Sequence, residues 1–387
     1  MYSINNLYDR MMDKESMTIR MYEGFKHKKK RTDVQKALEN PNAFRLETKF
    51  LIEGILEGDR SFAEFPHEPK TIYDQASRKE RQIIVPEIHE HVIHHMLINV
   101  TKPLYTRGMI DNTFSSISGR GLHRCSKYIR NKIDHEPAQC KYFLQTDIHH
   151  FFATIDHDIL KDRLERHICD KKVLKLLFAV IDTVDDGLPI GFYTSHWLAN
   201  WFLQPLDHLL QEKYHAHIYA RYMDDMLIGG PNKRHLHNTL EIIEAWLDEN
   251  HMSLKPNYQI RRFDYIDSDG NHHGEPIDFV GFQYYRDRTK LRDTIFLKFK
   301  RKAAAIGRKG YMTIYDARQM QSYLGWLRWA DIYEAYLKYV APNIKGISKC
   351  SQYISQYSKR QMHTEATVEV PGEAIVNYLL LMEKEVV

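Results

Sequence analysis

The chain has 387 residues and a mass of 46.0 kDa, enough for one large enzyme or for two to three subdomains. Its hydrophobic fraction of 43% supports a sizeable core, but no run of about 18 apolar residues predicts a membrane span. The four cysteines lack paired spacing, which argues against a zinc site and a disulfide framework. We therefore expect a soluble cytoplasmic protein with no membrane partner.

Positive charge is concentrated in two segments, although the net charge is only +4. One is the run from Lys26 to Arg31, and the other is the segment 286–309, which carries ten Lys or Arg against Asp287 and Asp293. Such runs are commonly solvated faces, but they also bind the phosphates of nucleic acids. The sequence at this stage leaves both interpretations open.

The N-terminal part of the chain is predicted to be helical. Apolar residues recur at three- and four-residue spacing within residues 1–65. Two short strands, Thr71–Tyr73 and Gln82–Val85, then flank a charged turn, and a helix follows Pro86. This helix carries the histidine-rich stretch 88–96, which we interpret as a polar helix face rather than a metal site.

Further along, strands and helices alternate from residue 147 to residue 285. A basic helical pattern follows from residue 287, and Gln319–Val340 is its longest predicted segment. The sequence contains no internal repeat.

Two acidic elements stand out in the alternating region. Tyr142–Leu144 leads into Asp147 like a buried strand that ends on a carboxylate, while Asp156 and Asp158 are explained as helix N-caps. Further on, Asp224 and Asp225 lie at the tip between two apolar runs, which predicts a hairpin. A polar surface turn would explain an isolated pair of aspartates. Three carboxylates at neighbouring strand ends instead suit two Mg²⁺ ions, the recurrent arrangement for phosphoryl transfer.

These elements resemble the motifs of reverse transcriptases. The segment Asp147–Asp156 resembles the first palm motif, Gly187–Asp207 the second, Tyr222–Asp225 the third, and Asp278–Tyr285 the primer-grip turn. The resemblance runs from residue 70 to residue 300, in the order of the family. It implies an α+β fold of the right-hand polymerase type, with fingers, an antiparallel palm and a helical thumb. The implied boundaries are a helical extension (1–70), fingers (71–146), palm (147–286) and a basic thumb with a C-terminal tail (287–387).

The resemblance assigns roles to individual residues. The catalytic carboxylates would be Asp147, Asp224 and Asp225, which would hold two Mg²⁺ ions, or Mn²⁺ as an alternative, together with Ile148. Phe152 would exclude a 2′-hydroxyl, because an apolar ring cannot satisfy that group. The other residues expected to contact the dNTP are Ile190, Gly191, Arg78, Lys79 and Arg120, since guanidinium groups suit phosphate oxygens.

Further roles lie at the edges of the site. We expect Gly187 and Gly191 to let the backbone pass close to a substrate or template base. Lys255 is a candidate general acid for pyrophosphate. The expected contacts to the nucleic-acid backbone are Lys298, Lys300, Arg301 and Lys302, which would hold a duplex without reading its sequence.

The implied activity is RNA-directed DNA polymerisation by a bacterial, non-retroviral nucleotidyltransferase. Its partners would be an RNA template, a DNA primer or product, dNTPs and an accessory protein or second polymerase subunit. Most family members have Gln at the position of Ile190, whereas the enzymes of diversity-generating retroelements have Ile there, as this chain does. Those enzymes carry Gln at the position of His196, however, and this chain does not. This departure favours an antiphage defence system with a dedicated noncoding RNA. Diversity generation and a non-catalytic RNA- or partner-binding scaffold are the alternatives.

Overall fold

A computed structural model describes residues 6–74, 79–344, 352 and 354–356 of the chain. The chain divides into two compact units, Met1–Asp287 and Arg288–Val387. Of the sequence predictions, Arg78 lies outside the described residues, and the C-terminal tail lies almost entirely outside them.

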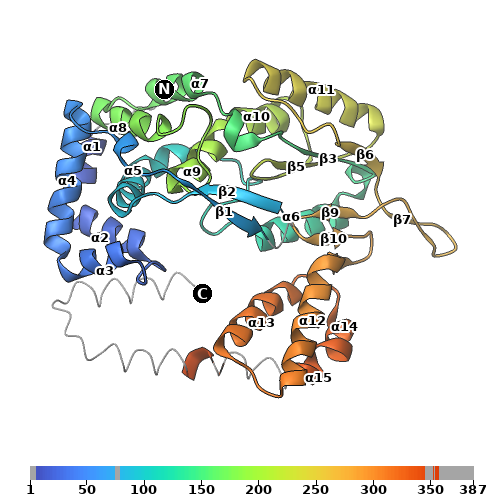
Figure 1. The fold of residues 1–387 in the computed structure, drawn as a ribbon. Helices are drawn as coiled ribbons and strands as arrows, with labels where there is room; N and C mark the ends of the chain where they lie inside the picture. The colour runs from blue at the N-terminus through green and yellow to red at the C-terminus, as the bar shows by residue number, and fades with distance from the viewer. Residues whose placement is uncertain (1–5, 75–78, 345–351, 353, 357–387) are drawn as a thin grey trace. The chain divides into compact units, whose positions relative to one another are not determined.

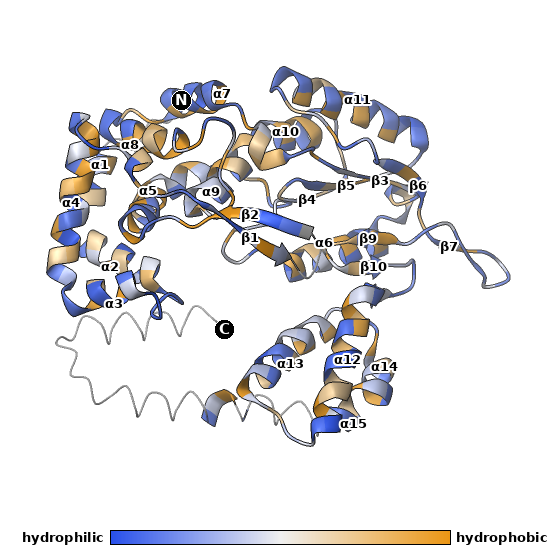
Figure 2. Ribbon diagram, in the orientation of Figure 1, coloured by the Kyte–Doolittle hydropathy of each residue, from blue (hydrophilic) through white to orange (hydrophobic). Residues whose placement is uncertain are grey.

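Short amphipathic helices open the first unit, as the sequence predicts. They are α1 (Leu7–Met12), α2 (Lys14–Phe25), α3 (Thr32–Glu39), α4 (Pro41–Glu57) and a 3-10 turn η1 (Phe62–Glu64). Helix α4 shows how the local sequence sets the boundaries, because Asn40 caps its first turn, Pro41 occupies the first helical position and Gly58 ends it at φ 91°. Helices α1 and α4 pack against both α5 (Ile88–Arg107) and α8 (Lys171–Ile181), α2 packs against α5, and α3 packs against α4 (Figures 1 and 2).

A two-stranded antiparallel hairpin follows, made of β1 (Pro69–Asp74) and β2 (Lys79–Ile84). Both strands are longer than predicted, and Lys79 is the first residue of β2. The hairpin is joined to the rest of the unit where the Ile84 N–H donates to the Ile190 carbonyl at 2.8 Å. Helices α5 and α6 (Leu122–His135) continue the chain toward the central sheet.

The histidine-rich stretch of α5 is not a polar face, so that prediction is wrong. His94 is fully buried and His91 nearly so, because α5 packs against α1, α2, α4, α8 and α9 (Tyr193–Phe202). Burial lowers the pKa of His91 to about 3 and that of His95 to about 4, so both imidazoles are neutral. His95 stacks on Tyr193 with ring centroids 4.1 Å apart. These histidines serve as aromatic packing groups.

The central sheet is antiparallel, in the order β4-β5-β3-β6. Its strands are β3 (Tyr142–Asp147), β4 (Ile218–Tyr222), β5 (Asp225–Gly230) and β6 (Gln259–Arg262). Helix α11 (Lys233–Glu249) packs on β3, β5 and β6, and α6 packs on β4 (Figure 1). The strands β3, β4 and β5 are largely buried, which matches their apolar sequences.

Helical segments connect these strands. A short 3-10 turn η2 (Pro137–Gln139) precedes β3. Between β3 and β4 lie η3 (Phe151–Thr154), α7 (His157–His167), α8, α9, α10 (Gln204–His208) and a π-helical turn η4 (Leu209–Lys213). Asp156 caps α7, as predicted, by accepting from the N–H groups of Asp158 and Ile159.

Two small hairpins close the first unit. One pairs β7 (Tyr265–Ile266) with β8 (His272–His273), and the other pairs β9 (Ile277–Phe279) with β10 (Phe282–Tyr284). The second hairpin is the predicted primer-grip turn, and its two central residues, Val280 and Gly281, both have positive φ angles. The Gln145 side chain donates to the Asp278 carbonyl at 2.9 Å, which ties this hairpin to β3.

The second unit contains β11 (Thr289–Leu291) and the helices α12 (Asp293–Lys309), α13 (Ile314–Leu327), α14 (Tyr333–Tyr339) and α15 (Ala341–Ile344). The predicted single helix Gln319–Val340 is wrong, because the chain leaves the helix after Leu327 and a new helix starts at Tyr333. Phe299, Met320 and Tyr336 belong to the small core that the helices enclose. None of the helices in the described residues is long and apolar enough to cross a bilayer. The predicted α+β class is confirmed.

Candidate active site

The β4–β5 hairpin brings three carboxylates to one edge of the central sheet. Tyr222 pairs with Asp225, so Met223 and Asp224 form the two-residue turn between them. Met223 has a φ of 61°, a conformation that non-glycine residues adopt rarely. On the next strand, Asp147 lies directly opposite Asp225. The register therefore brings together the two acidic elements, Asp147 and the pair Asp224–Asp225, which are far apart in the sequence.

The neighbouring carboxylates perturb Asp224 electrostatically. Burial, followed by the charges of Asp147 and Asp225, raises the pKa of Asp224 to about 7. The Oδ1 atom of Asp147 is buried, and no donor among the described residues reaches it while Asp224 is ionised. A protonated Asp224 can donate to Asp147, which also raises the pKa of Asp224. This arrangement fits a divalent cation, because a cation supplies the positive charge that clustered carboxylates lack.

Lys255 lies at the same point of the sheet. Its ammonium forms an ion pair with Oδ2 of Asp147, and its backbone N–H donates to the Asp147 carbonyl at 2.9 Å. Ile148 is fully buried and forms an isolated bridge with Leu254, so the chain segments around both residues are held together. The predicted general acid is therefore a direct neighbour of a predicted metal ligand.

Phe152 lies five residues after Asp147 and is half-buried. Its ring meets the His196 ring edge-on, with centroids 5.5 Å apart and planes at 87°. Burial lowers the pKa of His196, which keeps this imidazole neutral. His196 is thus in contact with the residue predicted to select the sugar.

Protein backbone packs closely against both motif glycines, and their predicted place near substrate or template stays a prediction. Gly187 has a φ of 69°, and a Cβ there would lie 2.4 Å from the Phe152 carbonyl oxygen. At Gly191 a Cβ would lie 2.2 Å from the Ile84 carbonyl oxygen. Both glycines therefore permit close packing between protein segments. Ile190 sits between them and accepts the Ile84 N–H through its carbonyl.

Arg120 is held by protein acceptors. Its guanidinium donates to the carbonyls of Ile110 and Thr113, the latter at 3.2 Å, and pairs with Asp111 at 3.3 Å. These contacts order the segment between α5 and α6, a role that the prediction of a nucleotide contact did not include. Lys79 lies at the start of β2, which the Ile84–Ile190 hydrogen bond joins to the second motif.

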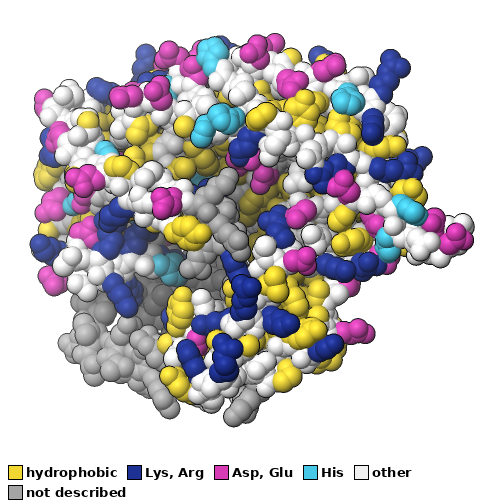
Figure 3. Space-filling model, turned by 45° about the vertical axis from the view of Figure 1, so that its right-hand side comes forward, with side chains coloured by type: hydrophobic (Ala, Val, Ile, Leu, Met, Phe, Trp, Pro, Cys, Tyr) yellow, Lys and Arg dark blue, Asp and Glu magenta, His cyan; other side chains and the backbone are white. Residues whose placement is uncertain are grey.

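The predicted phosphate contacts of the second unit divide into two kinds. Lys302 pairs with the buried Asp316 at 2.5 Å, and the Lys300 ammonium lies 3.7 Å from the centroid of the Tyr339 ring. These two side chains thus have partners within the unit, which the sequence did not indicate. On the same helix Arg301 is exposed and Lys298 is half-buried, and a phosphate contact of either residue stays a prediction. Figure 3 shows Lys and Arg side chains distributed over the visible face of this unit, between hydrophobic ones.

The sequence did not predict a buried ion pair between β4 of the β4–β5 hairpin, which we call the catalytic hairpin for its predicted role, and α10. Arg221 and Asp207 are both fully buried, and the guanidinium donates to both carboxylate oxygens at 2.6 Å. The available signal was an arginine within the apolar strand sequence Ile218–Tyr222, because a charged residue in a buried strand requires a partner.

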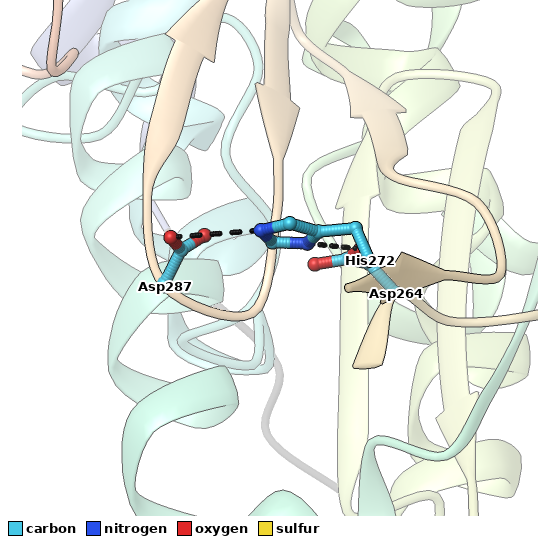
Figure 4. A group of neighbouring side chains, drawn as sticks. All are labelled: Asp264, His272 and Asp287. Carbon is cyan, nitrogen blue, oxygen red and sulfur yellow. Dashed lines mark hydrogen bonds and ion pairs between the residues drawn. The ribbon is translucent and has the colours of Figure 1, made fainter. Parts of the chain in front are cut away.

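A second acidic group lies at the β7–β8 hairpin. Asp264, His272 and Asp287 have potential ligand atoms within 4.8 Å of one another (Figure 4). The Nδ1 atom of His272 lies 2.8 Å from Asp264, and its Nε2 atom lies 3.8 Å from Asp287. Asp264 also accepts the Arg286 N–H at 2.7 Å. The imidazole thus lies between two carboxylates and links them at the base of the hairpin.

Comparison with known proteins places the chain in a family. Residues 69–283 match the reverse transcriptase (RNA-dependent DNA polymerase) family, and the chain belongs to it. Over 141 residues it is 28% identical to the Retron Ec73 reverse transcriptase of Escherichia coli, covering 31% of this chain and 44% of that protein. Over 151 residues it is 19% identical to Protein YkfC of Escherichia coli (strain K12), covering 36% of this chain and 40% of that protein. The chain thus spans less than half the length of these relatives.

Two solved telomerase structures are also similar. One is from Candida albicans, in complex with a fragment of telomeric RNA, with a TM-score of 0.42 at 11% identity over 65% of this chain and 52% of that one. The other is apo telomerase from Candida tropicalis, with a TM-score of 0.42 at 13% identity over 58% and 55%. The sheet β4-β5-β3-β6 lies within the residues that match the reverse transcriptase family.

Proposed function

We propose that the chain is an RNA-directed DNA polymerase that adds dNTPs to a DNA primer on an RNA template. The observation that carries this proposal is the convergence of Asp147, Asp224 and Asp225 at adjoining strand ends, in a chain of the reverse transcriptase family. A polar surface turn would not need a partly buried Asp224 with a pKa raised to about 7. The proposal explains this feature as a site for cations.

The carboxylates of Asp147 and Asp224 would hold two Mg²⁺ ions, or Mn²⁺ as an alternative, with Asp225 and the backbone of Ile148 alongside. When bound, such ions activate an attacking hydroxyl and neutralise charge on the leaving pyrophosphate. The fit rests on the buried Oδ1 of Asp147 and on the mutual repulsion of the carboxylates.

The remaining residues of the site orient the substrate and move a proton. Phe152 would lie beneath the incoming sugar and exclude a 2′-hydroxyl, which makes the product DNA. Lys255 is held next to Asp147 by its backbone N–H and by its ion pair, and its ammonium would act as the general acid for the leaving pyrophosphate. Arg78 and Lys79 would bind the triphosphate, while Ile190 and Gly191 would border the nascent base pair.

The biological setting that we propose is antiphage defence with a dedicated noncoding RNA as the template and with an accessory protein or second polymerase subunit. His196 supports it, because diversity-generating enzymes carry Gln there. The retron reverse transcriptase among the relatives is also a bacterial, non-retroviral enzyme. RNA that copurifies with the chain should be one structured species. A protected phage challenge that requires Asp224 would support defence, whereas adenine-directed changes in the cDNA would favour diversity generation.

The chemical proposal is tested by changing both turn carboxylates, Asp224→Asn with Asp225→Asn. The purified double variant should remain folded and should lose dNTP incorporation on a primed RNA template, because the charges serve metal binding rather than packing. Incorporation at the wild-type rate would refute the assigned site. A wild-type chain that binds primed RNA without any incorporation would instead support a non-catalytic scaffold.

A further inference from the structure

The ion pair between Arg221 and Asp207 lies directly behind the catalytic hairpin. Arg221 is in β4, two residues before Met223, and Asp207 is in α10. Both side chains are fully buried, and Nε and Nη2 of Arg221 each donate to one carboxylate oxygen at 2.6 Å. Such a bidentate pair is strong and geometrically specific.

Every polar atom of this pair has a partner. The five N–H groups of Arg221 bond to the two oxygens of Asp207, to the side-chain and main-chain oxygens of Asn200, and to the Met223 carbonyl. Asp207 also accepts from Tyr219 at 2.7 Å and from Thr113 at 3.3 Å. A buried charge pair that is fully hydrogen-bonded has one fixed geometry, because any displacement leaves a buried group without a partner.

One of these bonds reaches the catalytic turn itself. Nη1 of Arg221 donates to the Met223 carbonyl at 2.9 Å, and that carbonyl belongs to the peptide bond that leads into Asp224. Met223 has a φ of 61°, which an L-residue with a long side chain adopts only when its surroundings impose it. The guanidinium therefore fixes the peptide that aims the Asp224 carboxylate.

The same pair connects the turn to two other segments. The backbone N–H of Arg221 donates to the Asn112 carbonyl at 2.9 Å, and the backbone N–H of Phe114 donates to the Arg221 carbonyl at 3.0 Å. The Asn200 side chain donates to the Ser115 carbonyl at 3.0 Å. Residues 112–115, α9–α10 and the catalytic hairpin are thus held in one arrangement.

We propose that Arg221 and Asp207 are positioning residues, which hold the Met223–Asp224 turn so that Asp224 and Asp147 can bind the same pair of cations. Neither residue needs to touch substrate or metal. The inference rests on the proposed function, since it assigns the cations to the polymerase site.

The test compares two arginine-to-lysine changes. Arg221→Lys keeps the positive charge opposite Asp207 but cannot supply all five donors, so the bond to Met223 is lost. Arg163→Lys is the matched control, because Arg163 also donates to a main-chain carbonyl (Phe202, 2.7 Å) and to an asparagine side chain (Asn250, 2.5 Å), away from the catalytic turn. Each variant is assayed for kcat and KM for dNTP, and for Mn²⁺ binding by electron paramagnetic resonance without nucleotide.

Folded Arg221→Lys should lose about tenfold to a hundredfold in kcat, because small misplacements of catalytic groups cost that much, while KM for dNTP changes much less. Its half-saturating Mn²⁺ concentration should rise, and Arg163→Lys should match the wild type in both readouts. If Arg221→Lys does not fold, the double variant Asp207→Leu with Arg221→Met removes both charges together and serves instead, since apolar replacement of a buried pair is commonly tolerated.

Wild-type kcat and Mn²⁺ binding in the folded variant would overturn the proposal, and so would an equal loss in the Arg163→Lys control. Failure of the wild-type chain to polymerise would count against the proposed function instead. In that case the Mn²⁺ titration alone still decides whether Arg221 positions the carboxylates.

Discussion

Asp224→Asn is expected to make the metal-free protein more stable at alkaline pH while removing its activity. In the folded chain the pKa of Asp224 is about 7, above its ordinary value of 3.8, because of burial and the charges of Asp147 and Asp225. The folded state therefore retains a proton that the unfolded state releases as pH rises from 4 to 7. Because the folded state binds more protons in this window, the free energy of unfolding falls as pH rises through it. Asparagine carries no charge and removes this loss.

The size of the effect follows from the pKa difference. A shift of about 3 units corresponds to about 4 kcal/mol at about 1.4 kcal/mol per unit. Hydration and the Lys255 ammonium relax around the carboxylates, so we expect about 1–3 kcal/mol of relative stabilisation at pH 8, and none at pH 3.5. Urea unfolding in EDTA at both pH values measures it. Added Mg²⁺ should then stabilise the wild type but not the variant. A variant that is less stable than the wild type at pH 8 in EDTA would refute the electrostatic reasoning.

Three further changes test other parts of the site. Phe152→Ala should admit ribonucleotides, measured as rNTP against dNTP incorporation, whereas Phe151→Leu, in the buried neighbour, should keep the sugar preference. Ile190→Gln should lower the error rate by restoring a polar contact worth about 1–3 kcal/mol of discrimination, and an unchanged error spectrum would count against this role. Arg301→Ser should flatten the dependence of log K on log salt by about one unit for a lost phosphate contact. Lys302→Met should leave that slope unchanged and destabilise the second unit, because it leaves the buried Asp316 without its partner.

The sequence predicted those features that depend on local pattern. The apolar runs before Asp147 and around Asp224 each form a strand, and the hairpin at Met223–Asp224 is where the sequence indicated it. The N-cap at Asp156 and the turn at Val280–Gly281 likewise depend on only a few neighbouring residues.

Predictions that depended on tertiary partners were less successful. The histidines of α5 look polar in the sequence, but helices on several sides bury them as neutral rings. The sequence indicated the conformational freedom of Gly187 and Gly191, but not the carbonyl groups of Phe152 and Ile84 that pack closely against them. In the sequence Lys302 has no obvious acidic partner, but in the structure its ammonium pairs with Asp316 of the next helix. In each case the deciding contact lies outside the local pattern.

The most direct test of the central claim is primer extension on an RNA template with dNTPs, comparing Asp147→Asn with Asp158→Asn. Both residues are acidic and close in sequence, but Asp147 ends β3 beside the catalytic hairpin, whereas Asp158 is exposed in the first turn of α7. We expect the wild type and Asp158→Asn to extend the primer in Mg²⁺ and to stop in EDTA, and folded Asp147→Asn to produce no extension. Extension by Asp147→Asn at the wild-type rate would contradict the account.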